Sequence, residues 1–380
     1  MSNIDFILLY SLLFGAFALI PLKRQSYIDK NYWNFLSIFI LLFTFIIGLR
    51  YGWGNDYLSY KFRMEHPSLD EDAFYGLTNK ILQGIGFNYV MTYMLYAFLL
   101  VTGAFKFIKN YPHNKYMLAL FLPAMFFIGT STIRQGFATS IFLFGLAFLY
   151  EKKWIKMFFA FLIAYSIHTA ILIPMALFAG FYALSLVWKK PLPIIIILPL
   201  YIIIALSTDA ASLWFVNQFS NSFDWLSNFG KFESYSNQSS YWFGEEGISD
   251  VYVQTTFALI MSILFHSAYI YVGYKAIKLE GVPRNILYLY NSTIVGLFIL
   301  RIGMLLEIIH RIGDTMFAFY FVPLGFAISA YRYKWKQLSK NDRYFFLVSI
   351  IVILAYLAMF YGRFIFMSPK YGFVWNFIYN

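Results

Sequence analysis

Long apolar segments recur along this 380-residue chain and restrict its fold more than any other feature. Many of them approach the ~20 residues that a helix needs to cross the hydrocarbon core of a membrane. None shows the two-residue alternation that is typical of a membrane β-barrel strand. Hydrophobic residues make up 61% of the chain and charged residues only 12%, which is more apolar surface than one soluble core can bury. We therefore predict an all-α, polytopic integral membrane bundle.

Counting the apolar segments predicts about 12 transmembrane helices in a single integral membrane domain, residues 1–380. They are expected near residues 5–21, 32–49, 88–105, 116–129, 135–150, 154–170, 172–188, 191–207, 251–274, 285–305, 313–331 and 344–361. His168 and Pro174 favour a tight hairpin over residues 154–188 rather than one long tilted helix. Two long connections, 50–87 and 208–250, remain.

The net charge of +11 comes from basic residues in short tufts between the apolar segments. Basic residues in this arrangement set the orientation of helices in a membrane, and they do not favour nucleic acid as a partner. With twelve helices, all the tufts fall on one side, which the positive-inside rule makes cytoplasmic. The tufts are Lys23-Arg24, Lys106/Lys109/Lys115, Lys152-Lys153/Lys156, Lys189-Lys190, Lys275/Lys278/Arg284 and Arg332/Lys334/Lys336/Lys340/Arg343. Loops 50–87 and 208–250 then face outward.

Arginine is distributed differently from lysine. Six arginines lie at or near the outer face: Arg50, Arg63, Arg134, Arg301, Arg311 and Arg363. A guanidinium group stays charged when it is partly buried, and its planar fork binds phosphate or carboxylate through two hydrogen bonds. The outer arginines therefore indicate an anionic ligand.

The first candidate cluster, Gly48–Tyr60, follows the apolar segment 32–49 directly and contains Arg50, Asp56, Tyr57 and Tyr60. Ionisable groups at the membrane edge are costly without a partner, so they indicate a binding site. A structural ion pair between Arg50 and Asp56 is the alternative.

The second cluster, Thr130–Gly136, is a polar break between two apolar segments. It places Arg134 near a helix N-terminus, where backbone N–H groups and the guanidinium group can hold a phosphate together. The alternative is that Arg134 caps neighbouring carbonyl groups or extends to the interface.

The third cluster lies between two late apolar segments and consists of Arg301, Glu307, His310, Arg311 and Asp314. Arg311 is a candidate anion ligand. Salt bridges within the cluster are the alternative, since Glu307 and Arg311 have the i,i+4 spacing of a helical pair.

His168 lies in an otherwise apolar segment, and its ring could accept the proton of a sugar hydroxyl. A hydrogen-bonded core histidine is the alternative, and we interpret His266 in that structural way. The absence of cysteine excludes thiolate chemistry. The acidic run Asp70–Asp72 is expected to be solvated, so no metal site and no cofactor are predicted. Aromatic residues in the loop 208–250 suit sugar stacking or an interfacial belt.

With these residues identified, the chain resembles the EpsG family of Wzy-like polymerases, which includes many bacterial O-antigen and exopolysaccharide polymerases. Three motifs carry the resemblance. They are Gly48–Tyr51 with Gly54–Tyr57 and Tyr60; Ile133–Gln135 with Lys152-Lys153 and His168; and Arg311–Pro323.

The resemblance implies a glycosyltransferase in the bacterial cytoplasmic (inner) membrane, with its active face outward. It would join oligosaccharide repeat units carried on undecaprenyl diphosphate, a membrane lipid, in lipopolysaccharide or exopolysaccharide biosynthesis. It would need no metal and no cofactor, and a chain-length regulator and a flippase would be its partners.

On this hypothesis Arg134 and Arg311 neutralise the departing diphosphate, where charge develops in the transition state. Arg50 would be a third clamp, and Asp56 would orient Arg50 or a sugar hydroxyl. Tyr57 and Tyr60 would shape the acceptor groove, and Gln135 and Arg301 would bind substrate. His168 would be the general base.

Two other functions remain open. A lipid-linked oligosaccharide flippase or transporter would also use many helices and membrane arginines, although its polar features would gather near the midplane in repeated, broken helices. A membrane acyltransferase that acts on glycans would combine arginine and histidine as well, with the two closer in sequence than Arg134 and His168.

Overall fold

The computed structural model describes residues 3–22, 31–51, 56–68, 73–111, 114–208, 214, 255–280, 284–304, 307–367 and 374–375. It divides into two compact units. The first contains residues 1–179, 321–336 and 357–380, and the second contains residues 180–320 and 337–356. The chain passes between the units more than once, so they are interleaved in sequence. Each unit is described by itself, and the single domain remains a prediction.

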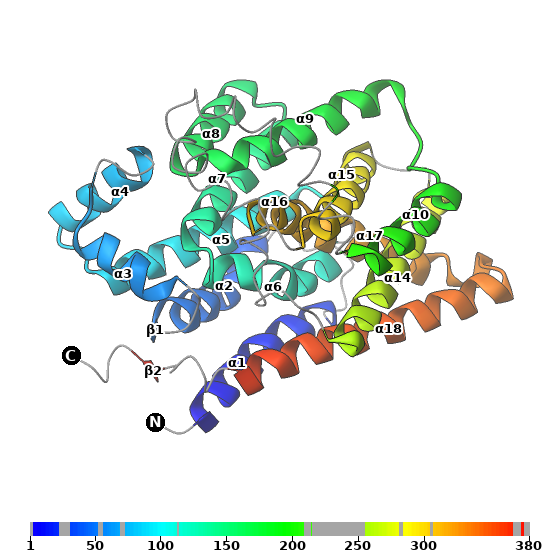
Figure 1. The fold of residues 1–380 in the computed structure, drawn as a ribbon, viewed down its shortest axis with the longest axis horizontal. Coiled ribbons are helices and arrows are strands. Elements are labelled where there is room, and N and C mark those ends of the chain that lie inside the picture. The colour runs from blue at the N-terminus through cyan, green and yellow to red at the C-terminus, as the bar shows by residue number, and fades with distance from the viewer. Residues whose placement is uncertain are drawn as a thin grey trace. The chain divides into compact units, whose positions relative to one another are not determined.

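The first unit holds helices from the N-terminal part of the chain and one from its C-terminal part (Figure 1). They are α1 (Asn3–Leu19), α2 (Tyr32–Gly48), α3 (Tyr57–Glu65), α4 (Ala73–Gly84), α5 (Tyr89–Lys109), α6 (Lys115–Thr130), α7 (Ile133–Tyr150), α8 (Trp154–Ile167) and α17 (Phe321–Tyr333). The second unit holds α10 (Ile194–Leu206), α14 (Thr256–Glu280), α15 (Arg284–Ile302) and α16 (Glu307–Phe317). Helices α9 (Leu172–Val187) and α18 (Lys340–Met367) contribute to both.

The predicted all-helical membrane fold is confirmed. Within the described residues, 7 helices are long and apolar enough to cross a membrane, and shorter apolar helices account for the rest of the predicted set. The only extended pairing in the described part of the chain is antiparallel, between β1 (Arg50–Tyr51) and β2 (Val374–Trp375). The chain is therefore a multi-pass helical membrane protein.

The predicted hairpin at 154–188 is confirmed by two ring contacts. The ring of Phe142 on α7 lies 5.4 Å from that of Phe161 on α8 and 5.6 Å from that of Phe178 on α9. Phe161 and Phe178 are thus within about 11 Å of each other, whereas one straight helix would separate them by about 26 Å. The reversal begins at His168, which has extended backbone angles (φ −153°, ψ 107°). His168 therefore ends α8 and does not lie within it, which corrects the predicted bound at residue 170.

Two loop predictions need correction. The connection 50–87 contains two helices, α3 and α4, and not only irregular chain. The turn expected before residue 313 is shorter than predicted, because α16 already begins at Glu307 and a 3-10 turn, Ala318–Tyr320, joins it to α17. Several predicted features lie outside the described residues: Lys23-Arg24, Gly54, Asn55, Asp70–Asp72 and most of the loop 208–250.

Close helix packing in the first unit depends on glycine. Gly136 lies in the first turn of α7, and a Cβ atom added there would lie 2.7 Å from the carbonyl oxygen of Ile128 on α6. Gly103 on α5 also allows close packing, because a Cβ atom added there would lie 2.7 Å from the carbonyl oxygen of Ser140 on α7. Without these side chains the helix backbones approach closely, as is common for small residues between membrane helices.

Helices α15 and α16 form a tight pair in the second unit. A Cβ atom added to Gly313 of α16 would collide with the backbone nitrogen of Leu300 on α15. Gly296 of α15 allows the reciprocal approach, because its Cβ would lie 2.5 Å from Met316. The side of α16 that carries Gly313 is therefore covered by α15.

Candidate functional site

Arg50 lies at the ends of two helices in the first unit. Its Nη1 donates a hydrogen bond to the carbonyl oxygen of Ile47, in the last turn of α2, and its Nη2 donates to that of Thr130, the last residue of α6, at 2.8 Å. The partial negative charge of both helix C-termini stabilises the guanidinium group. The Arg50 side chain is only 1% exposed. This geometry favours a supporting role over the direct contact with ligand that we expected from the sequence.

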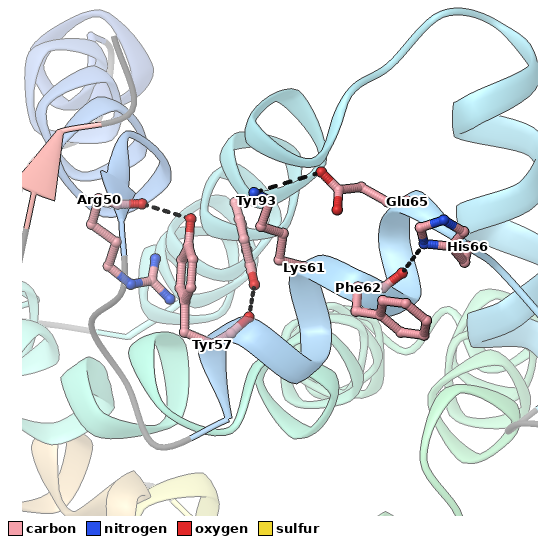
Figure 2. Close-up of polar contacts among 7 residues, drawn as sticks. All are labelled: Arg50, Tyr57, Lys61, Phe62, Glu65, His66 and Tyr93. Atoms are coloured by element: carbon pink, nitrogen blue, oxygen red, sulfur yellow. Dashed lines mark hydrogen bonds and ion pairs between the residues drawn. The ribbon is translucent and has the colours of Figure 1, made fainter. Parts of the chain in front are cut away.

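Tyrosines complete the surroundings of Arg50 (Figure 2). The guanidinium carbon lies 5.7 Å from the ring centre of Tyr57 and 5.4 Å from that of Tyr93, within the range of cation–π attraction. The Tyr57 hydroxyl donates to the carbonyl oxygen of Arg50 at 3.0 Å, and the Tyr93 hydroxyl donates to that of Tyr57 at 2.8 Å. These bonds fasten the start of α3 to β1 (Arg50–Tyr51) and to α5.

The aromatic packing continues from α3 to α7. The ring of Tyr60 contacts that of Tyr75 on α4, and Tyr75 contacts Tyr96 on α5. Tyr96 stacks on Phe137 of α7 with the ring centres 4.3 Å apart, and its hydroxyl donates to Asn79 Oδ1 at 2.7 Å. Tyr57 and Tyr60 are both buried. They therefore position α3 and α4 in this structure, and a direct contribution to an acceptor groove stays a prediction.

A small cavity lies beside this cluster, lined by Arg50, Tyr93, Tyr96, Ile133 and Phe137 among others. Its volume of about 10 Å³ gives room for about one water molecule. The cavity connects the Arg50 guanidinium to the first turn of α7. It is too small for a sugar or a phosphate.

Lys61 and Glu65 lie one turn apart on α3 (Figure 2). Lys61 forms an i,i+4 ion pair with Glu65 at 3.8 Å, and Lys61 Nζ lies 4.5 Å from the ring centre of Tyr89. Asp56 occupies the N-cap position of α3, where its carbonyl oxygen accepts the first helical hydrogen bond from Tyr60. Asp56 is half-buried, and its expected role towards Arg50 or a sugar hydroxyl is not tested by this geometry.

Arg134 is the second residue of α7, so the predicted placement of this arginine at a helix N-terminus is confirmed. The N-cap residue, Thr132, gives no side-chain cap to α7, because its hydroxyl donates back to the carbonyl oxygen of Ile128 at 3.4 Å. Arg134 is half-buried, and Gln135 beside it is buried. A half-buried cation at a helix start is suited to an anion, because both the helix dipole and the guanidinium attract negative charge.

His168 caps the C-terminus of α8 and is half-buried. Its backbone N–H donates to the carbonyl oxygen of Ala164 at 3.1 Å, and its own carbonyl oxygen accepts from Ile171 at 3.1 Å. The residue thus helps to reverse the chain between α8 and α9. The predicted role as a base remains untested.

A buried polar chain occurs in the second unit. Arg301, in the last turn of α15, donates from Nε to the Tyr201 hydroxyl at 3.3 Å, and this hydroxyl lies 2.5 Å from His266 Nδ1. Each of the three side chains is at most 3% exposed. The chain links α10, α14 and α15, which agrees with the structural interpretation of His266. Arg301, predicted as a substrate ligand, is packed within the helices instead.

Helix α16 carries the other predicted residues of the second unit. Arg311 and Asp314 are half-buried, and His310 Nδ1 lies 3.3 Å from Asp314 Oδ2. Glu307 and Arg311 belong to one continuous helix, as the alternative of a local pair requires, but the Glu307 side chain is outside the described residues. The sequence predicts His310 and Asp314 as members of the third cluster and assigns neither a role of its own.

Sequence reasoning also missed Tyr93, Tyr96, Asn79 and Tyr201. Tyr93 and Tyr96 were counted as part of an apolar segment, although their i,i+3 spacing places them on one side of α5. Their hydroxyl groups, and not their rings alone, connect the loop helices to the bundle. In the described part of the chain, no group of three or more His, Cys, Asp or Glu side chains is arranged to hold a metal ion.

The model of the EpsG family matches residues 33–376, nearly the whole chain. The chain belongs to the EpsG family. EpsG proteins are Wzy-like polymerases, so the resemblance drawn from the three motifs is confirmed at the level of the family. No curated protein and no solved structure matches this EpsG chain.

Proposed function

We propose that this EpsG protein is a polysaccharide polymerase of the bacterial cytoplasmic membrane. It would join oligosaccharide repeat units carried on undecaprenyl diphosphate at the outer face, in O-antigen or exopolysaccharide synthesis. The observation that carries the proposal is the family match over residues 33–376. The multi-pass helical fold agrees with a substrate that stays in the membrane through its lipid.

The proposed reaction forms one glycosidic bond for each lipid diphosphate released. The acceptor hydroxyl attacks the anomeric carbon of the donor sugar, and the bond from that carbon to the diphosphate oxygen breaks. Negative charge then grows on the diphosphate, so a cation that is already in place lowers the barrier. Arg134, at the start of α7, supplies such a cation in the first unit. Arg311 on α16 supplies one in the second.

Arg50 is assigned a supporting role in this proposal. Its hydrogen bond to Thr130 holds the end of α6, and only Ser131 and Thr132 separate that residue from the start of α7. The position of Arg134 therefore depends on Arg50. Tyr57 and Tyr93 hold Arg50 in place through their rings.

The test is the size distribution of the surface polysaccharide after deletion of the gene. Wild-type protein and the Arg134→Ala variant are restored at equal protein level, with Lys156→Ala as the control that removes an exposed basic side chain from the first turn of another helix, α8. We expect wild type and Lys156→Ala to restore a ladder of repeat units. We expect Arg134→Ala to leave single units.

Other outcomes would contradict specific parts of the proposal. Normal polymer length with Arg134→Ala would refute the role of Arg134. Complete loss of surface glycan on deletion would favour a flippase, and an unchanged ladder with a missing acyl group would favour an acyltransferase.

A further inference from the structure

The ionisable residues of α16 lie along one side of the helix. Glu307, His310, Arg311 and Asp314 have the spacing i, i+3, i+4 and i+7, which places them in one stripe. The opposite side contains Gly313 and Met316 and packs against α15. A membrane protein rarely retains a line of ionisable groups without a use for them, because each is costly to keep away from water.

Within the stripe, one carboxylate is placed to orient an imidazole ring. His310 Nδ1 lies 3.3 Å from Asp314 Oδ2, one helical turn further along. A carboxylate in this position fixes the imidazole tautomer, with the proton on Nδ1, and leaves Nε2 as a proton acceptor. The His310 side chain is 15% exposed and that of Asp314 is 29% exposed, so the pair is accessible from outside the helix packing.

The backbone that carries the pair is firmly placed. Gly313 lies between His310 and Asp314 in sequence and packs directly on the backbone of Leu300 in α15. Gly303 provides a second close approach, because a Cβ atom added there would lie 2.7 Å from the backbone nitrogen of His310. The Thr315 hydroxyl donates to the carbonyl oxygen of Arg311 at 2.9 Å. Such a rigid support suits a group that must meet its substrate in a fixed orientation.

We propose that His310 is the general base of the polymerisation reaction and that Asp314 is its positioning residue. This inference rests on the proposed function. His310 Nε2 removes the proton from the acceptor sugar hydroxyl while that oxygen bonds to the anomeric carbon of the donor. The bond from the anomeric carbon to the diphosphate breaks, and its electron pair leaves with the lipid diphosphate. The imidazolium ion then passes its proton to solvent, which restores the base.

Arg311 is next to His310 in the same stripe, so a proton acceptor and a cation for the leaving group occur side by side on one helix. His168 caps α8, and its backbone hydrogen bonds reverse the chain before α9. The structure therefore favours His310 over His168, which was the base expected from the sequence.

The test uses the full-length protein in lipid vesicles and lipid-linked repeat units extracted from a strain that lacks the polymerase. His310→Gln keeps the size of the side chain but cannot act as a base at neutral pH. We expect kcat to fall by about 10²–10⁴-fold with KM within about threefold of wild type. Asp314→Asn should lower kcat by at least about tenfold, and Asp314→Glu should recover part of the loss. His66→Ala, which changes an exposed histidine directly after α3, is the matched control.

A second measurement separates chemistry from folding. His310→Gly creates space for an added imidazole, and we expect imidazole to raise its rate while His310→Gln shows no response. A purely structural histidine would give no rescue. Activity of His310→Gln and Asp314→Asn within threefold of wild type would overturn the assignment. Failure of the wild-type protein itself to extend glycan would refute the polymerase proposal instead, so the two failures are distinguishable.

Discussion

Replacement of Arg50 by alanine should destabilise the protein because this side chain joins the ends of α2 and α6. Two charge-assisted hydrogen bonds to the carbonyl oxygens of Ile47 and Thr130 would be lost. Each such bond contributes about 1.5–3 kcal/mol, and the buried acceptors would remain unsatisfied. The attraction between the guanidinium and the rings of Tyr57 and Tyr93 would be lost as well. We expect the free energy of unfolding to fall by about 3–5 kcal/mol.

Arg50→Lys separates the effect of charge from that of geometry. Lysine keeps the positive charge, but its ammonium group cannot reproduce the planar fork that reaches both helix ends. We expect it to lose about half as much stability as Arg50→Ala. Arg63→Ala is the control, because this half-buried arginine on α3 makes a cation–π contact with Tyr60 at 5.9 Å that contributes about 0.5–1 kcal/mol.

The assay is reversible unfolding of the purified protein in mixed detergent micelles of increasing denaturing-detergent content, followed by tryptophan fluorescence. Binding of lipid-linked repeat units is measured on the same samples. If Arg50→Ala unfolds with a free energy within 1 kcal/mol of wild type and yet loses substrate binding, Arg50 is a ligand and the supporting role is wrong.

Three further predictions concern other contacts. Burial alone would raise the pKa of Glu151, but hydrogen bonds from Lys106 and Lys153 lower it to about 2. Glu151→Gln should therefore lower the free energy of unfolding by about 1–2 kcal/mol at pH 7. Unfolding measured at each pH should show that this difference in free energy from wild type disappears as the pH falls from 4.5 towards 2. Gly136→Ala should lower the free energy of unfolding by about 1–3 kcal/mol in the same assay, because its methyl group meets the backbone of α6. Gly84→Ala is the control and should not destabilise the protein, because its added methyl has nothing within 4 Å. Tyr201→Phe removes a hydroxyl bonded within the second unit and should lower the free energy of unfolding by about 1–3 kcal/mol. An unchanged free energy of unfolding would show that this buried chain adds no stability.

The helices could be predicted from the sequence because the membrane requires long apolar segments. The predicted and observed bounds of α2, for example, are 32–49 and Tyr32–Gly48. The hairpin at His168 could also be predicted, since charge topology needed the extra crossing. Helices α3 and α4 could not, because they are short, carry polar residues and are held by the tyrosines of α5. That support comes from packing between segments and leaves no local pattern.

The candidate site was predicted less completely than the fold. The position of Arg134 at a helix start follows from a polar break in an apolar sequence, and the structure agrees. Burial of Arg50 could not be predicted, because its acceptors are backbone carbonyl groups of α2 and α6, and any residue can supply a carbonyl group. The pairing of His310 with Asp314 required the knowledge that α16 is continuous from Glu307.

On the proposed function, this EpsG chain alone lengthens a lipid-linked glycan. The most direct measurement uses purified protein in vesicles that contain radiolabelled, lipid-linked repeat units, with product length and released lipid diphosphate determined together. We expect a ladder of repeat units and one lipid diphosphate released for each bond formed. Movement of unextended units across the vesicle membrane, with no diphosphate released, would contradict it.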